Sequence, residues 1–486
     1  MKFKKIQPSH VSLILAALTW MIGSQISVAE SKPNIIVFLT DDQGYNDVGC
    51  FGSPDIKTPN FDRMAEEGML FTNAYVGSPV CGPSRSALMT GSYPIRIGEP
   101  RNTKALHTIP HTKELMIPEV LKPMGYATAI VGKWHAGNAK TQGDPRSQGF
   151  DYFFGTPRFN GVTKYINQKI SAPLMRNEEV IVKRIEQKEM DQLTTMYTEE
   201  AITFITANKD KPFFLYLAHN MPHVPLGVSD KFRGKSKGGL YGDVIEELDW
   251  SMGEILKTLK ELKLDDNTMV VFISDNGPWI EKQIGDHAGH AEPLRGAKMM
   301  SWEGGPRVPC IMRWPGKIPA GKTSDAIVTT MDLLPTLAGL AGASLPADLV
   351  IDGKDIKPLI TGATDQSPHK YYYYYCFTHL QAIRDARWKM VLPRKAKPLW
   401  MGWWGRMIDE VKVVQLYDLS KDLGEKTNVA DAHPEIVARL TKQIESARAE
   451  LGDYNVLGTG ARFYDEGIKR PKLVKAKGAS TNKKKK

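Results

Sequence analysis

The stretch Asn34–Thr40 (NIIVFLT) is followed at once by Asp41 and Asp42, and it decides how the rest of the chain is interpreted. A short continuous apolar run bounded by polar residues is typical of a strand that is buried on both faces, as in a parallel sheet. Further runs of this kind occur at residues 127–131, 212–218 and 268–274. We therefore expect these segments to be buried strands of one sheet.

Helical patterns lie between the predicted strands. A helix is expected to begin at Thr58-Pro59, because proline fits a first helical turn and Phe61, Met64 and Ala65 follow at helical spacing. Longer helical patterns cover residues 190–207 and 244–264. The alternation predicts an α/β fold with a large mixed, mainly parallel sheet sandwiched by helices, extending over residues 30–365.

The character of the chain changes after about residue 365. A tyrosine run at 371–375 precedes QAIRDARWKMVL (residues 381–392), which is typical of two strands about a turn. Residues 416–419 are a third strand candidate, and residues 434–451 are predicted to be a helix. We expect a small C-terminal antiparallel-sheet-plus-helix subdomain at 366–455, followed by a basic, disordered tail at 456–486.

Both ends of the chain are basic. Lys2, Lys4 and Lys5 precede an apolar run at 11–23 and small residues at 27–29, which predicts a signal peptide at 1–29 and a secreted or periplasmic protein. A membrane anchor is the alternative, but the run is shorter than the ~20 residues that span a bilayer.

The net charge of +10 comes from these ends, since residues 1–29 contribute +3 and residues 469–486 contribute +9, leaving −2 for the body. We therefore expect no nucleic-acid partner for the body. No stretch after residue 29 is apolar enough to span a bilayer, so we also expect no transmembrane segment. The tail is predicted to be solvated, with binding of a sulfated polymer or a membrane surface as the alternative.

Acidic and amide side chains follow two of the predicted strands. Asp41 and Asp42 come after the first strand, and Asp275 and Asn276 follow the strand at 268–274. The carboxyl ends of the strands form the edge where open α/β sheets bind ligands. Oxygen ligands of this kind suit Ca²⁺, with Mg²⁺ as the alternative. Taken singly, each pair is equally typical of a turn or a helix cap.

The segment CGPSR carries Cys81, Pro83 and Arg85. Pro83 favours the first turn of a helix that continues through residues 84–90, so Cys81 is expected at a helix N-terminus, where free N–H groups favour an anion. Arg85 is four residues further on and would lie on the same face. A buried structural cysteine is the other interpretation.

Basic and imidazole side chains recur near the predicted strand ends. Lys133 and His135 are two residues apart and are expected to project to the same side. His223 follows the strand at 212–218, and Lys298 lies in a glycine-containing loop. His287 and His290 precede Lys298 in a loop that is either exposed to solvent or in contact with substrate, and His219 is taken as structural. The chain has four cysteines, Cys50, Cys81, Cys310 and Cys376, too few for a disulfide scaffold.

These motifs and their order along the chain resemble those of the formylglycine-dependent type I sulfatases of the alkaline phosphatase superfamily. The matching segments are CGPSR at 81–85, GKWHAG at 132–137, MPHVP at 221–225 and PLRGAK at 293–298. Residues 247–250 and 294–309 resemble the arylsulfatase A and N-acetylgalactosamine-6-sulfatase branch. The resemblance implies a secreted bacterial polysaccharide sulfatase acting on a sulfated glycan.

The resemblance also implies a role for each residue. A formylglycine-generating maturation enzyme would oxidise Cys81 to 3-oxoalanine, leaving three cysteines. The implied catalytic residues are Cys81, Arg85, Lys133, His135, His223 and Lys298. The implied metal ligands are Asp41, Asp42, Cys81, Asp275 and Asn276. The implied substrate-binding residues are Lys133, His223, Lys298 and His290. Two alternatives are a phosphate or phosphonate ester hydrolase of the same superfamily and an inactive secreted glycan-binding protein.

Overall fold

A computed structural model describes residues 32–98, 114–137, 143–159, 172–279, 288–398, 405–454 and 456–462. Its main feature is an 11-stranded sheet in the order β10-β2-β9-β8-β1-β7-β3-β4-β5-β6, with β11 paired to β2. The strands are β1 (Asn34–Thr40), β2 (Met69–Tyr75), β3 (Ala127–Lys133), β4 (Tyr152–Thr156), β5 (Leu174–Arg176), β6 (Glu179–Val182), β7 (Phe213–Ala218), β8 (Thr268–Ser274), β9 (Arg307–Arg313), β10 (Lys322–Ser324) and β11 (Val328–Thr329). The expected signal peptide and residues 463–486 of the expected tail lie outside the described residues.

The first strand holds the centre of the sheet. β1 pairs in parallel with β7 on one side and with β8 on the other, and β7 pairs in parallel with β3. β9 runs antiparallel between β8 and β2, and β5 and β6 add an antiparallel edge. The prediction of a mixed, mainly parallel sheet is therefore confirmed.

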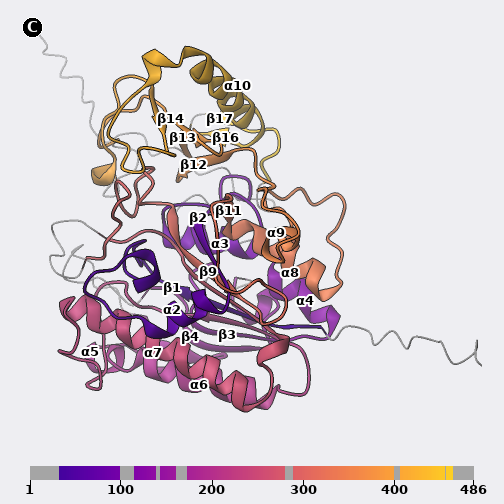
Figure 1. Ribbon diagram of the computed structural model, residues 1–486. Helices are drawn as coiled ribbons and strands as arrows, with labels where there is room; N and C mark the ends of the chain where they lie inside the picture. Colours follow the sequence, from indigo (N-terminus) through magenta and orange to yellow (C-terminus); the bar gives the residue numbers. More distant parts are fainter. Residues whose placement is uncertain are drawn as a thin grey trace, which may run out of the picture. The chain divides into compact units, whose positions relative to one another are not determined.

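Helices cover both faces of this sheet (Figure 1). They are α2 (Pro59–Glu66), α3 (Cys81–Thr90), α4 (Ile117–Leu121), α5 (Gln187–Met190), α6 (Leu193–Ala207), α7 (Gly239–Glu261), α8 (Leu333–Ala341) and α9 (Lys357–Ile360). Side chains of β1 alternate between two apolar cores: Ile36 and Phe38 pack with α2, α6 and α7, whereas Ile35, Val37 and Leu39 pack with α3, α4 and α8. Burial on both faces explains why β1 is continuously apolar.

The C-terminal part forms a second, smaller sheet. β12 (Tyr372–Cys376), β13 (His379–Arg384), β14 (Trp388–Val391) and β15 (Gln415–Asp418) are antiparallel in that order. Helix α10 (Pro434–Glu450) and the hairpin β16 (Gly452–Asp453) and β17 (Val456–Leu457) complete this subdomain, drawn in orange and yellow in Figure 1. The predicted antiparallel sheet plus helix is present. Within the described residues, no helix combines the length and the apolar character that crossing a bilayer requires.

Candidate active site

The carboxyl edge of the central strands gathers the acidic groups. Asp41 and Asp42 follow β1, and Asp275 follows its neighbour β8, so the parallel register Thr40↔Ser274 brings them side by side. One oxygen from each of these three carboxylates lies within 4.8 Å of the others, and all three residues are buried. Asp42 has a φ of 66°, which is unusual for a residue with a side chain and is a form of backbone strain found at functional sites.

These oxygens meet the requirements of a hard divalent cation. Asp41 Oδ1 and Asn276 Oδ1 are buried and accept no hydrogen bond within the part of the chain that the structure describes. Asn276 Nδ2 donates to Asp42 Oδ1 at 2.7 Å, which fixes the amide with its oxygen directed elsewhere. Burial and then the neighbouring Asp41 raise the pKa of Asp275 to about 6. Clustered buried carboxylates of this kind favour binding of a cation that neutralises their charge.

Cys81 begins helix α3 next to this cluster. Its side chain is buried, and its Sγ lies 4.0 Å from Lys298 Nζ. Burial raises the pKa of the Cys81 thiol, although Lys133 and Lys298 oppose the shift. One turn along the helix, Arg85 donates from Nε to Asp275 Oδ2 at 2.8 Å and from Nη1 to Lys133 O at 2.7 Å. The predicted helix N-terminus and common face are both observed.

Two buried lysines pair with the strand-end carboxylates. Lys133 Nζ is hydrogen-bonded to Asp41 Oδ2, and Lys298 Nζ lies 2.5 and 2.6 Å from the two oxygens of Asp42. Trp279 lies beneath the Lys298 ammonium, with the ring centroid at 4.8 Å. With Arg85, these lysines put three cationic groups among three carboxylates, so the site balances charge and can also receive an anion.

The two predicted catalytic histidines are both buried at the site. His223 Nε2 lies 3.6 Å from Asp42 Oδ2, and its Nδ1 is 2.6 Å from Val224 O. Burial lowers the pKa of His223 well below its usual value, with Asp42 opposing. His135 is buried too, but it lies beyond the strand: β3 ends at Lys133, and a φ of 55° turns the chain at His135, so strand alternation does not set its direction.

His290 occupies a different position from the other site residues. Its ring Nδ1 and its backbone N–H each lie 2.9 Å from Oδ1 of the buried Asp47, and the side chain is 54% exposed. Tyr241 donates to the other Asp47 oxygen at 2.5 Å. His290 therefore lies in an exposed loop beside the chain that follows Asp42. His287 is outside the described residues.

His219, Cys310 and Cys376 are buried and fit structural roles. Burial lowers the pKa of His219 to about 3, and its Nε2 lies 3.3 Å from Ser251 Oγ. All four cysteines, Cys50, Cys81, Cys310 and Cys376, are among the described residues, and no disulfide links them.

Sequence reasoning missed the aromatic walls of the site. Phe159 stacks on His223 with centroids 6.0 Å apart and meets His135 edge-on at 5.4 Å. Trp279 supports Lys298, as described above. Tyr216 on β7 lies near Arg85, which opposes the rise in its pKa caused by burial. Phe159 belongs to no motif. Tyr216 is part of the apolar run of β7, and Trp279 follows shortly after Asn276, so no local pattern marked either as a site residue.

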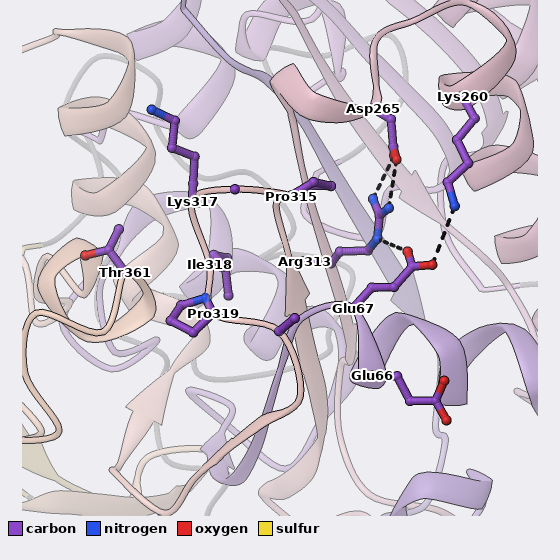
Figure 2. A pocket seen from close by; sticks show the side chains of 12 residues that line it. Glu66, Glu67, Lys260, Asp265, Arg313, Pro315, Lys317, Ile318, Pro319 and Thr361 are labelled. Carbon is purple, nitrogen blue, oxygen red and sulfur yellow. Dashed lines mark hydrogen bonds and ion pairs between the residues drawn. The ribbon is translucent and has the colours of Figure 1, made fainter.

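A surface pocket lies at the opposite edge of the sheet (Figure 2). Arg313, the last residue of β9, forms two hydrogen bonds with Asp265, just before β8, at 2.7 and 2.8 Å. Its Nε donates to Glu67 at 2.7 Å, and Lys260 pairs with the same carboxylate at 3.5 Å. The charges of this pocket neutralise one another, and none of the predicted site residues lines it.

The fold and the site together define an α/β protein in which buried lysine and arginine side chains can receive an anionic group beside a cluster of metal-binding type. Residues 33–343 match the protein-family model described as Sulfatase, and the chain belongs to this family. Residues 297–450 also match the C-terminal model of N-sulphoglucosamine sulphohydrolase. The chain is thus a type I sulfatase, a sulfuric ester hydrolase.

Similar proteins come from animals and bacteria. The chain is 35% identical to human steryl-sulfatase over 78% of both chains. It is 38% identical to N-acetylgalactosamine-6-sulfatase of Canis lupus familiaris over 77% of this chain and 76% of the relative. A solved structure from a study of glycosaminoglycan metabolism by Bacteroides thetaiotaomicron, labelled BT33336S-sulf, superposes with a TM-score of 0.73 at 30% identity, covering 86% of this chain and 99% of its own.

Proposed function

We propose that this sulfatase hydrolyses sulfate esters of a sulfated polysaccharide or oligosaccharide through a formylglycine formed from Cys81. The observation that carries the proposal is the position of Cys81 at the start of α3, with Lys298 Nζ 4.0 Å from its Sγ and Arg85 one turn away. A helix N-terminus and these cations would hold a sulfate group against residue 81. As a buried thiol with a raised pKa, unmodified Cys81 is a poor nucleophile.

The aldehyde provides the nucleophile that the thiol lacks. Hydration of the aldehyde at residue 81 gives two hydroxyl groups on one carbon. A divalent cation, Ca²⁺ or Mg²⁺, held by Asp41, Asp42, Asp275, Asn276 and residue 81, would lower the pKa of a nearby hydroxyl and offset the charge of the sulfate oxygens. Asp275 receives the proton of one hydroxyl, and Arg85 and Lys133 hold the hydrate in place.

The attacking oxygen forms a bond to sulfur while the bond between sulfur and the ester oxygen breaks. Lys298 and His223, which both contact Asp42, would neutralise the sulfate oxygens and donate a proton to the departing alcohol. A bound sulfate would oppose the low pKa of His223, because a nearby negative charge favours the imidazolium.

The second hydroxyl makes release an elimination. His135 removes its proton, the carbon–oxygen double bond re-forms, and the bond between that carbon and the sulfate oxygen breaks. Sulfate leaves with the bonding electrons, and one water restores the hydrate. No second attack on sulfur is needed.

A glycan is the substrate class that the relatives favour. One relative is named for N-acetylgalactosamine-6-sulfate, and the bacterial structure comes from a study of glycosaminoglycan metabolism. The exposed His290 at the edge of the site would contact the sugar, held in place by Asp47. With the predicted signal peptide, this supports a secreted or periplasmic bacterial enzyme.

The test is to co-express the chain with a formylglycine-generating enzyme and to measure sulfate release from defined sulfated oligosaccharides, a steroid sulfate, an aryl sulfate and an aryl phosphate. We expect sulfated oligosaccharides to be turned over and the peptide containing residue 81 to be about 18 Da lighter than its thiol form. Cys81→Ala should be folded and inactive. Full activity of a preparation with only unmodified cysteine would refute the nucleophile, and preference for the phosphate or steroid would refute the substrate class.

A further inference from the structure

Lys298 lies in irregular backbone and is not held by a helix or a strand. Its own N–H donates to Pro278 O at 3.0 Å, and the next N–H, from Met299, donates to Pro79 O at 2.8 Å. Met299 has a φ of 73°, a conformation that costs free energy for a residue with a side chain. Contacts with the rest of the protein must therefore hold this segment in shape.

The C-terminal subdomain contacts the segment from its other side. Cys376 Sγ, on β12, lies 3.2 Å from Met299 O. Ser301 is bound twice: its Oγ donates to Gln381 Oε1 at 2.8 Å, and its carbonyl oxygen accepts from Lys389 Nζ at 2.9 Å. These contacts fall one to three residues after Lys298, so the subdomain fixes the backbone that carries this ammonium group.

Lys389, on β14, is the centre of this contact. Its side chain has 0% exposure, and its Nζ lies 3.1 Å from Glu303 Oε1 and 2.7 Å from Glu425 Oε1. Glu425 in turn accepts the backbone N–H of Glu303 at 2.8 Å, and Tyr374 presents its ring face to the ammonium at 4.0 Å. A buried ammonium is tolerated only with such partners, so Lys389 holds residues 301–303 firmly.

Two arginines also balance the charge of Glu303, one of the two carboxylates that Lys389 contacts. Arg307 Nη1 lies 3.3 Å from Glu303 Oε2, and Arg384 Nη1 lies 3.7 Å from the same oxygen. Burial alone would raise the pKa of Glu303, but Lys389, Arg384 and Arg307 hold it below its usual range. Glu303 is therefore an ionised anchor at the far end of the segment that carries Lys298.

We propose that Lys389 is a positioning residue for Lys298: through Ser301 O, Glu303 and Glu425 it sets where the Lys298 ammonium meets the sulfate group. The inference rests on the proposed role of Lys298. It makes the C-terminal subdomain a part of the catalytic apparatus although Lys389 does not touch the reacting atoms. Displacing a reacting group by ~1 Å can cost about a hundredfold in rate.

The test is a double-mutant cycle between Lys389→Met and Lys298→Ala, measured on an aryl sulfate with a good leaving group and on one with a poor leaving group. Because Lys389→Met leaves two buried carboxylates short of a cation, Lys389→Met/Glu425→Gln serves as a charge-balanced second variant. Glu450→Gln is the control, since it breaks another contact between subdomain and main domain, the 2.7 Å pair with Arg96, away from Lys298.

We expect both Lys389 variants to lose roughly tenfold or more in kcat, with the larger loss on the poor leaving group, as for Lys298→Ala. In the Lys298→Ala background the further loss should fall below about twofold, because coupled residues are not additive. Glu450→Gln should change neither kcat nor the dependence of kcat on the leaving group.

Equal losses on both substrates that multiply with those of Lys298→Ala would overturn the inference and leave the proposed function standing. If Lys298→Ala itself retained full activity, both the role of Lys298 and the inference would be wrong.

Discussion

His223 and His135 both pack near Phe159, but the proposed reaction requires His223 to donate a proton and His135 to remove one. His223 contacts Asp42 and in this proposal would protonate the departing oxygen, whereas His135 would act only after sulfur has been transferred. Their burial keeps water away from both imidazoles, so each proton transfer depends on the bound groups and not on solvent.

The histidine roles predict different substrate dependences. His223→Ala should slow a sugar sulfate by roughly a hundredfold or more but a nitrophenyl sulfate far less, because a sugar alkoxide needs a proton and a nitrophenolate does not. His135→Ala should instead let a sulfated enzyme accumulate on either substrate, detectable as a mass increase. Equal losses for His223→Ala on both substrates, with no trapped species for His135→Ala, would mean that the roles are assigned wrongly.

At the scale of the elements, the ends of β1 and β8 bring together the carboxylates that we propose as cation ligands. Asp41→Asn or Asp275→Asn removes one of three clustered negative charges while keeping the shape of the side chain. We expect bound Ca²⁺, measured by elemental analysis, to fall strongly and activity to fall with it. Asp365→Asn, on an exposed carboxylate paired with Lys322 at 2.6 Å, is the surface control. Unchanged activity after exhaustive chelation of the wild type would contradict the cation site.

How much the sequence predicts depends on what each element buries. β1, β3, β7 and β8 are buried on both faces, so their apolar runs were visible, and β8 was located at residues 268–274 as predicted. β2 and β9 were not predicted, because polar side chains interrupt their apolar runs. These side chains lie in residues 73–75 (NAY) of β2 and 307–313 (RVPCIMR) of β9, where they make specific contacts. The helix expected at 190–207 is observed as α6, which begins three residues later at Leu193, and residue 190 is the last residue of the separate short helix α5.

Site residues were predictable where charged side chains follow the end of a predicted strand or fall within a recognisable motif. Asp41, Asp275 and Arg85 followed from position in the pattern, but Phe159, Asp47 and Lys389 are defined by partners distant in sequence. Lys389 contacts Ser301, 88 residues away, and no local pattern contains that information.

At the scale of the whole molecule, residues Pro33–Lys486 form one unit. The subdomain shares the buried Glu303, Lys389 and Arg384 network with the main sheet, so neither part can unfold without leaving charges unpaired. We expect calorimetry to show a single cooperative transition in which loss of activity coincides with loss of secondary structure. Two separate transitions, with the subdomain melting first while activity persists, would contradict this expectation.

The burial of Cys81 in the folded chain also limits the time during which an enzyme could modify it. Every residue of α3 is buried in the folded chain, so an enzyme that modifies Cys81 must reach it before α3 is covered. Lys298 is 217 residues further along. At synthesis rates of about 5–20 residues per second, that separation corresponds to roughly 10–40 s. The segment around Cys81 thus leaves the ribosome well before Lys298 is synthesised, and the proposed conversion of Cys81 would have to be complete before the chain folds over α3.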